Sequence, residues 1–278
     1  MTISTDAVLQ AALVSAATQN NPFLAHLQLA SAAGASTLAG TELEPAANAV
    51  SRATNKFWSA TPNGSSVARI SFDLGAATSV SFVGIAAHNL ADIGATVSLQ
   101  YSSDGSTWNS APAGSVTPSD NMAIGFRMVA VSARYFRVSV TNASGDVVIG
   151  VVLLSRELLI ERTFYQGYPP PLTPTRVELL TSRTEGGHFL GTSAIERGSD
   201  VSPVISNLRP EFLRGATWLE FQRSFNRGES LFWAWRPTKY PGDLFYARRP
   251  AGAGALVPTN SGPRELMSVE LQMELYHE

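Results

Sequence analysis

The chain has 278 residues, of which 44% are hydrophobic and 15% charged, and it contains no cysteine. This length accommodates one large domain or two ordinary domains, each with its own core. Twenty basic and twenty-two acidic side chains give a net charge of -2, so the basic surplus that neutralises nucleic-acid phosphates is missing. The absence of cysteine excludes disulfides, thiolate nucleophiles and iron–sulfur clusters.

The N-terminal segment is apolar in part, but no Lys or Arg precedes the apolar stretch as in a secretory signal. Asp6 to Ala17 is the only stretch of the first 160 residues that predicts a helix, with Thr5 or Asp6 as its cap. The longest strongly apolar run, Val147 to Leu154, is far shorter than the roughly 20 residues that cross a bilayer. We therefore expect a soluble chain without membrane insertion.

The remainder of residues 1–160 follows a period of two, which is typical of half-buried strands. Apolar and polar side chains alternate in the segments 68–74, 97–101, 124–128 and 136–140. Val147 to Leu154 predicts a strand that is buried on both faces. Gly, Asn, Asp and Ser between these segments supply turns. The spacing predicts an antiparallel sandwich.

A change of composition near residue 161 predicts two domains. Charged side chains are about twice as dense in residues 161–278 as in residues 1–160. The prolines of the segment 161–174 lack a backbone donor and favour extended geometry. We predict a first domain over 1–160 with an N-terminal extension, a Pro-rich linker over 161–174, and a second, mainly β domain over 175–278.

Candidate strands of the second domain cover residues 176–181, 218–223, 231–235 and 267–275. In 267–275 every second residue is apolar, which indicates burial on one side, and a strand so near the chain end is expected at a sheet edge. In 231–235, Leu231, Trp233 and Trp235 share one face while Phe232 lies on the other. This pattern predicts that the strand is covered on both sides.

Few residues of the sequence suit catalysis. The four histidines are scattered without metal-ligand spacing, no Gly-rich phosphate loop ends in Lys, and no G-x-S-x-G motif occurs. Carboxylates brought together from distant strands remain an alternative. We expect a protein that is not an enzyme, with no cofactor and no metal site, and we leave a structural calcium ion open.

Three segments of the first domain resemble a known family in order and spacing. They are Ala68 to Gly75 (ARISFDLG), the hairpin Tyr101 to Trp108 (YSSDGSTW) with its tight Asp104–Gly105 turn, and Arg134 to Val138 (RYFRV). Together they resemble the discoidin or galactose-binding-like jelly roll over about residues 40–160. The resemblance implies an all-β protein, in which a discoidin-like antiparallel β-sandwich jelly roll precedes the second, mainly β domain.

Further segments look like the version of this module found in bacteriophage virion structural proteins. They are Glu44 to Ser59, with its PAAN and FWS stretches, and Val83 to Leu90 (VGIAAHNL). Residues 218–225 and 231–237 are similar to C-terminal domains of phage tail-tip and baseplate proteins. The resemblance implies a structural component of a phage tail tip or baseplate that assembles in multiple copies and contacts host-surface glycans. The alternative is a carbohydrate-binding module protein of a secreted bacterial polysaccharide system.

The resemblance implies a ligand site in the loops at one end of the sandwich. The candidate carbohydrate-binding residues there are Arg52, Asn55, Trp58, His88 and Asn89. Trp58 and Trp108 each either stack on a sugar ring or belong to the core. His88 and Asn89 either donate to sugar hydroxyls or fix their own loop through bonds to the backbone.

Large aromatic side chains of the second domain form a candidate protein–protein interface, because such side chains are enriched in interface cores. They are Phe232, Trp233, Trp235, Tyr240, Phe245 and Tyr246, and part of this set must be domain core. The expected partners are other virion tail proteins, copies of the chain itself and a cell-surface glycan, but not nucleic acid. The expected location is the virion tail, after synthesis in the host cytoplasm.

Overall fold

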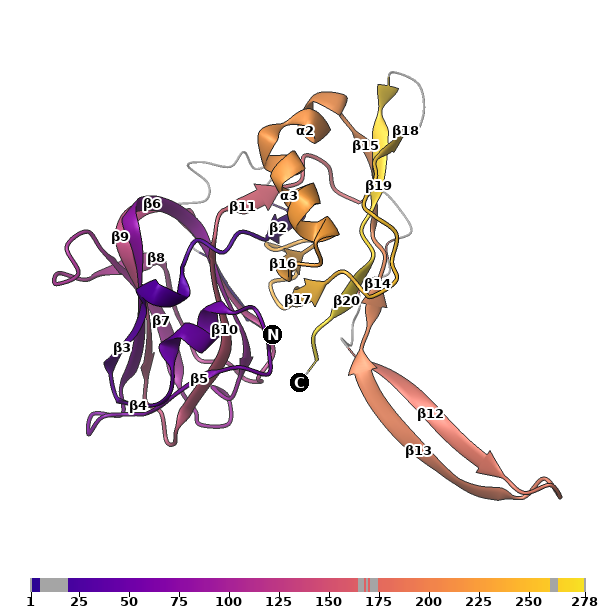
Figure 1. The fold of residues 1–278 in the computed structure, drawn as a ribbon, viewed down its shortest axis with the longest axis horizontal. Coiled ribbons are helices and arrows are strands. Elements are labelled where there is room, and N and C mark those ends of the chain that lie inside the picture. The colour runs from indigo at the N-terminus through magenta and orange to yellow at the C-terminus, as the bar shows by residue number, and fades with distance from the viewer. Residues whose placement is uncertain are drawn as a thin grey trace.

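The computed structural model describes residues 2–5, 20–164, 168, 170, 175–260 and 265–277. Within this part of the chain, strands form a jelly roll, a six-stranded sheet, a three-stranded sheet and a two-stranded hairpin that projects from the body (Figure 1). The predicted helix Asp6 to Ala17 lies outside the described residues, as does most of the predicted linker. The all-β fold class is confirmed.

The jelly roll occupies residues 31–155. Its strands are β3 (Ala35–Ala39), β4 (Thr41–Glu44), β5 (Trp58–Thr61), β6 (Ala68–His88), β7 (Thr96–Ser102), β8 (Asn109–Val116), β9 (Ile124–Thr141) and β10 (Val147–Ser155), with short 3-10 turns η1 (Ala32–Gly34) and η2 (Ala46–Val50). These strands pair antiparallel, and β1 (Thr2–Thr5) adds to β9 in parallel. Each segment that the period of two marked lies within one of these strands.

The long strands β6 and β9 connect the two layers of the sandwich. They pair from Ala68 opposite Val140 to Ile85 opposite Ile124, with irregularities after Asp73 and after Val80. Alternate side chains of both strands, among them Ile70, Phe72, Phe136 and Val138, are fully buried in one core. Burial of each large apolar side chain contributes about 1.5–3 kcal/mol, so the alternation accounts for the sandwich.

A second unit surrounds the six-stranded sheet, whose order is β11-β2-β16-β17-β20-β14. Its strands are β2 (Phe23–Ala25), β11 (Glu157–Leu159), β14 (Asp200–Val201), β16 (Leu231–Ala234), β17 (Leu244–Arg248) and β20 (Met273–Leu275). The three-stranded sheet has the order β15-β19-β18, with β15 (Val204–Leu208), β18 (Thr259–Asn260) and β19 (Met267–Glu270). Helices α2 (Pro210–Arg214) and α3 (Ala216–Asn226) cover the six-stranded sheet on its far side from the jelly roll (Figure 1).

The sheet of the second unit includes strands from both sides of the jelly roll in the sequence. β2 precedes the jelly roll, β11 follows it, and the two pair with each other antiparallel. β2 also pairs with β16, so that Ala25 lies opposite Phe232. The jelly roll is therefore inserted between two strands of the second unit, and that unit does not begin at residue 175 as predicted.

The prediction of a strand over 218–223 is wrong, because this segment lies in helix α3. Trp218, Phe221 and Phe225 are buried on one face of the helix, at spacings of three and four residues that match its 3.6-residue period. Gly228, with φ of 77°, follows the end of the helix. Here the helical period describes the burial better than alternation does.

The segment 267–275 forms two strands instead of one, and neither is at a sheet edge. β19 lies between β15 and β18, and β20 lies between β17 and β14. The predicted alternation is confirmed, since Val269, Leu271, Met273 and Leu275 are all buried. The edge prediction is wrong because each of the two strands has a partner strand on both sides.

Strand β16 joins the two units. Trp233 belongs to the core between the six-stranded sheet and the helices, whereas Phe232 on the opposite face packs on the jelly roll. The Phe232 ring lies 5.6 Å from that of Phe82 in β6. The predicted burial of 231–235 on both sides is thus confirmed, and the neighbour that covers Phe232 is the jelly roll of the same chain.

A buried ion pair adds to this contact. Arg127 in β9 is only 1% exposed and donates to Glu157 of β11 at 2.5 Å. Its guanidinium lies over the ring of Phe23 in β2, 5.0 Å from the centroid. Apolar packing and a desolvated ion pair therefore hold the two units in one arrangement.

Candidate functional site: a cleft between the two units

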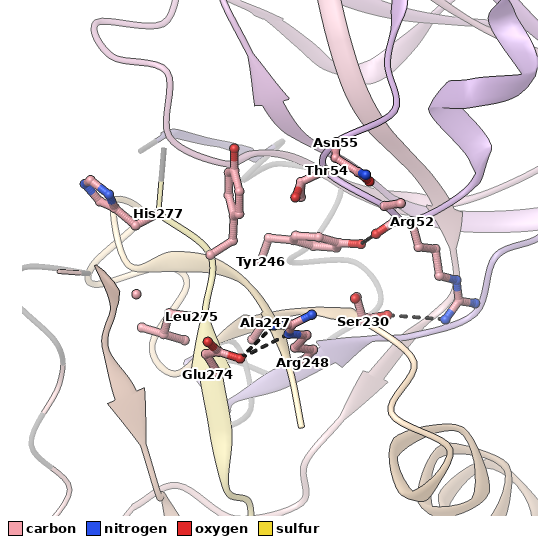
Figure 2. Close-up of a pocket in the computed structure, with 13 residues that line it drawn as sticks. Arg52, Thr54, Asn55, Ser230, Tyr246, Ala247, Arg248, Glu274, Leu275 and His277 are labelled. Atoms are coloured by element: carbon pink, nitrogen blue, oxygen red, sulfur yellow. Dashed lines mark hydrogen bonds and ion pairs between the residues drawn. The ribbon is translucent and has the colours of Figure 1, made fainter. Parts of the chain in front are cut away.

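A cleft of about 410 Å³ separates the loop 52–55 of the jelly roll from strands β17 and β20 of the second unit (Figure 2). This volume is within the range of small-ligand sites. Its lining residues are Arg52, Ala53, Thr54, Asn55, Gly198, Ser230, Tyr246, Ala247, Arg248, Glu274, Leu275, Tyr276 and His277. The cleft therefore exists only when both units are in place.

Arg52 links the two walls of the cleft. Its guanidinium donates to Glu229 at 3.0 Å and to the carbonyl oxygen of Ser230 at 3.3 Å. The hydroxyl of Tyr246 donates to the carbonyl oxygen of Arg52 at 2.7 Å. Arg52 has a φ of 63°, a left-handed conformation that is uncommon outside glycine. These bonds from the second unit hold the loop in that shape.

The charges around the cleft are paired. Arg248 and Glu274 approach within 3.1 Å on neighbouring strands, and Arg52 is paired with Glu229. Burial raises the pKa of Tyr246 to about 12, so its phenol stays neutral and donates. Each charged side chain of the lining thus has an ion-pair partner, and Glu229 also pairs with Arg227.

Three polar side chains of the lining remain available. Thr54, Asn55 and His277 make no side-chain hydrogen bond to another residue within the described part of the chain. Thr54 and Asn55 come from the jelly roll, whereas His277 comes from the segment after β20, on the other wall (Figure 2). A hydroxyl, an amide and an imidazole each offer both a donor and an acceptor.

The structure removes Trp58 from the predicted carbohydrate-binding set. Trp58 lies in β5, is 0% exposed and donates its indole N–H to the hydroxyl of Thr37 at 2.8 Å. A ring that is closed in on both faces cannot stack on a sugar, so this part of the prediction is corrected. Of the two alternatives left open for Trp58, the core is the right one.

His88 and Asn89 fix their own loops. His88 is 1% exposed, its Nε2 bonds the carbonyl oxygen of Met122 at 2.8 Å, and its Nδ1 accepts the N–H of Leu90. Burial lowers the pKa of His88 to about 4. The amide of Asn89 donates to the carbonyl oxygen of Asp146 and accepts the N–H of Val148, each at 2.9 Å. Neither residue lines the cleft, which retains Arg52 and Asn55 of the predicted set.

A second hollow, of about 530 Å³, lies beside the Asp104–Gly105 hairpin. Trp108 and Tyr135 line it, as does the half-exposed Leu38. The guanidinium of Arg137 covers one face of Trp108, 4.0 Å from the ring centroid. The hollow is thus more open than the cleft and offers fewer enclosed polar groups.

Most of the predicted interface aromatics are buried inside the chain. Phe232, Trp233, Phe245 and Tyr246 are all at most 4% exposed, so they cannot contact a partner protein, and this prediction is wrong for them. Trp235 is half-buried and donates to Asp243 at 2.6 Å. Tyr240, stacked on Trp235, is 39% exposed. The alternation predicted a strand for Phe232, Trp233 and Trp235 but could not show that the jelly roll covers one of its faces.

Residues 31–152 match the family model of the F5/8 type C domain. The match covers the jelly roll and ends within its last strand, β10. No curated protein matches the chain. The matched residues include all three segments that carried the discoidin-like resemblance.

Solved structures with some likeness to the chain each cover less than half of it. Chitosan-binding module 1 from a chitosanase/glucanase of Paenibacillus sp. IK-5 has 19% sequence identity and a TM-score of 0.41, covering 47% of this chain and 100% of that chain. CpGH89CBM32-5 from Clostridium perfringens, solved with GalNAc-beta-1,3-galactose, has 11% identity and a TM-score of 0.39, covering 44% and 94%. The CBM32 of AlyQ, in complex with 4,5-unsaturated mannuronic acid, has 22% identity and a TM-score of 0.37, covering 47% and 96%.

Sequence reasoning missed the half of the cleft that the second unit supplies. Arg248, Glu274 and His277 come together with Asn55 only because β17 and β20 pair beside the F5/8 type C domain. No local motif marks these residues.

Within the described residues, no group of three or more His, Asp or Glu side chains is arranged to hold a metal ion, and no helix there is long and apolar enough to span a bilayer.

Proposed function

We propose that the chain is a carbohydrate-binding protein without catalytic activity, and that a neutral oligosaccharide binds in the cleft between the F5/8 type C domain and the second unit. The observation that carries the proposal is the set of available polar groups, Thr54, Asn55 and His277, on the walls of a cleft of about 410 Å³ whose charges are paired.

Sugar hydroxyls both donate and accept hydrogen bonds, so they suit groups that also do both. The amide of Asn55 and the hydroxyl of Thr54 meet this requirement on the jelly-roll wall. On the opposite wall, the Arg248–Glu274 pair presents a fixed donor and a fixed acceptor. Because both Arg side chains of the lining already have a carboxylate partner, an anionic ligand would compete with these ion pairs, which favours an uncharged sugar.

Binding of the full chain to a panel of immobilised neutral oligosaccharides tests the proposal. Each lost hydrogen bond costs roughly 1–1.5 kcal/mol, which corresponds to about a tenfold rise in Kd. We expect such a rise for Asn55→Ala. Asn109→Ala is the matched control, because Asn109 is exposed on β8 and does not line the cleft.

Three results would contradict the proposal. The first is the absence of any sugar on the panel that binds the wild-type chain. The second is wild-type affinity of both Asn55→Ala and Thr54→Ala. The third is loss of binding in Trp108→Ala together with full binding in Asn55→Ala, since the sugar would then occupy the hollow beside the hairpin.

A second candidate function is that of a repeated structural subunit in a bacteriophage tail tip or baseplate. The observation that favours it is the two-stranded hairpin that projects from the second unit (Figure 1). Under this proposal the second unit docks on the tail, other virion tail proteins are partners, and the jelly roll faces outward. Protein analysis of purified virions from the host strain tests it, and absence of the chain from intact particles would refute it.

A further inference from the structure

The hairpin of β12 (Thr175–Arg183) and β13 (Phe189–Gly198), here called the arm, is paired with no other strand of the described chain. Nine residues of strand extend about 30 Å, and the arm points away from the body (Figure 1). A two-stranded hairpin alone is marginally stable in water. The arm thus has the form of an element that becomes covered in an assembly.

Apolar side chains lie on both faces of the arm. Val177 and Leu179 share one face, where Leu179 lies opposite Ala194. The other face carries Leu180 and Ile195 beside the ion pair between Glu178 and Arg197. The isolated chain buries neither face.

The arm also holds much of the exposed apolar surface. Of the twelve large hydrophobic side chains that are exposed in the described residues, six belong to the arm: Val177, Leu179, Leu180, Phe189, Leu190 and Ile195. The two most exposed of all, Phe189 at 76% and Leu190 at 65%, lie at its tip. Contiguous exposed apolar surface of this kind marks a site of interaction.

The second unit contains a groove with complementary chemistry. A hollow of about 240 Å³ lies along the three-stranded sheet, lined by Phe225, Leu256 and Val269, with Val204 and Val257 exposed at 50% and 63%. Its one charged lining residue is Glu270. The tip of the arm carries Arg183 over the ring of Phe189, 4.8 Å from the centroid. Thr259, Ser268 and Gln272 also line the groove, so the match consists of the two exposed valines for the apolar tip and of Glu270 for the cation.

The arm cannot reach the groove of its own chain. It projects from the end of the second unit where β14 and β20 lie, whereas β15, β18 and β19 extend to the opposite end (Figure 1). The arm, residues 175–198, has three Arg and three Glu, so it lacks the net positive charge that would bind a polyanion or an anionic membrane. A groove of this kind that receives the arm must therefore belong to a second copy of the chain.

We propose that the tip of the arm, Phe189 and Leu190, docks in the groove between β19 and the segment 254–257 of a second copy of this chain. The two surfaces differ, so the contact is head-to-tail and leaves one arm and one groove free in a pair of copies. Such contacts continue into a closed ring or an open filament. The proposal is independent of sugar binding, because the cleft is formed within one chain.

Crosslinking of cysteine variants tests the proposal, since the natural chain has no cysteine to interfere. One variant is Leu190→Cys at the tip of the arm, and the other is Val257→Cys at the groove. We expect a short bis-maleimide to join the two variants when they are mixed, and to join neither variant to itself. The control partner is Leu43→Cys, because Leu43 is 53% exposed on β4 of the jelly roll. Crosslinking of Leu190→Cys to itself, or to Leu43→Cys as efficiently as to Val257→Cys, would overturn the proposal.

Light scattering of the uncrosslinked protein provides an independent measurement. We expect wild-type chains to form multimers whose mass rises with concentration, and Phe189→Glu to reduce that mass to one chain while thermal unfolding is unchanged. Leu43→Glu is the control and should assemble as the wild type does. A monomeric wild-type chain, or a Phe189→Glu variant that assembles normally, would refute arm docking.

Discussion

The contact of Gly84 with Phe232 allows a quantitative test of how the jelly roll and the second unit are joined. A methyl group on Gly84 would lie 2.4 Å from the Phe232 ring, far inside the contact distance of two carbon atoms. The ring cannot move aside, because it is 0% exposed and lies 5.6 Å from the ring of Phe82 and 4.9 Å from that of Tyr246.

The expected magnitudes follow from this geometry. Gly84→Ala overfills the contact and should reduce the free energy of unfolding by about 1–3 kcal/mol. Phe232→Ala leaves a cavity and should reduce it by about 3–5 kcal/mol. In the double variant the new methyl group enters the space that the ring has left. The two effects should therefore fall short of additivity by about 1–3 kcal/mol.

Urea unfolding of the four proteins, wild type, both single variants and the double variant, measures this coupling. Tryptophan fluorescence is a suitable signal because Trp58 reports on the jelly roll and Trp233 on the second unit. Additivity within about 0.5 kcal/mol would refute the reasoning. It would mean that Phe232 does not pack on β6 in solution.

Three further predictions concern buried side chains. Trp58→Ala should destabilise the chain by about 3–5 kcal/mol in urea unfolding, because Trp58 is core; a stable variant that only loses sugar binding would contradict its burial. Burial, and to a smaller extent Arg52, lowers the pKa of His26 from 6.5 to about 4 in the folded chain. Between these two pH values the unfolded chain takes up a proton at His26 and the folded chain does not. The free energy of unfolding should therefore fall by up to about 1.4 kcal/mol per pH unit as the pH drops from 6.5 to 4. His26→Leu should weaken this dependence in unfolding curves across that range, and an unchanged dependence would count against it. Leu271→Ala should cost about 2–5 kcal/mol and Glu270→Ala less than about 0.5 kcal/mol, since Leu271 is 0% exposed and Glu270 is exposed; equal unfolding free energies would contradict this order.

The jelly roll was predictable because its information is local. Alternation over six or seven residues marks each strand, as in Ile70 and Phe72 of β6 or Val97 and Leu99 of β7, all at most 1% exposed. Turn residues such as Gly105, with φ of 75°, separate these strands. Local patterns of this kind determine which faces are buried, and the core follows from them.

The sequence-based predictions that failed concern contacts between distant segments of the chain. Trp58 occupies a short strand that pairs with β10, a pairing that its own surroundings do not indicate. β2 has only three residues, too few for a period to be seen. The segment around Phe221 contains apolar residues that fit both alternation and a helical period, and only its burial pattern distinguishes the two.

The cleft was half predictable for the same reason. Arg52 and Asn55 lie close in the sequence and were found through the family resemblance of their loop. Arg248 lies in β17 and His277 follows β20, and both come close to the loop only through tertiary packing. A polar residue in a strand of average composition gives no sign that it faces a cleft.

The insertion of the jelly roll between β2 and β11 has a consequence for synthesis of the chain. β2 leaves the ribosome early, but its partner β16 begins only at Leu231. At about 5–20 residues per second, β2 waits roughly 10–40 s for that partner. The inserted jelly roll is complete well before then, and its surface already contacts Phe23 through Phe82 and Arg127. β2 and β11 can pair on this surface as soon as residue 159 has emerged. The jelly roll then acts as the template on which the rest of the six-stranded sheet adds, strand by strand.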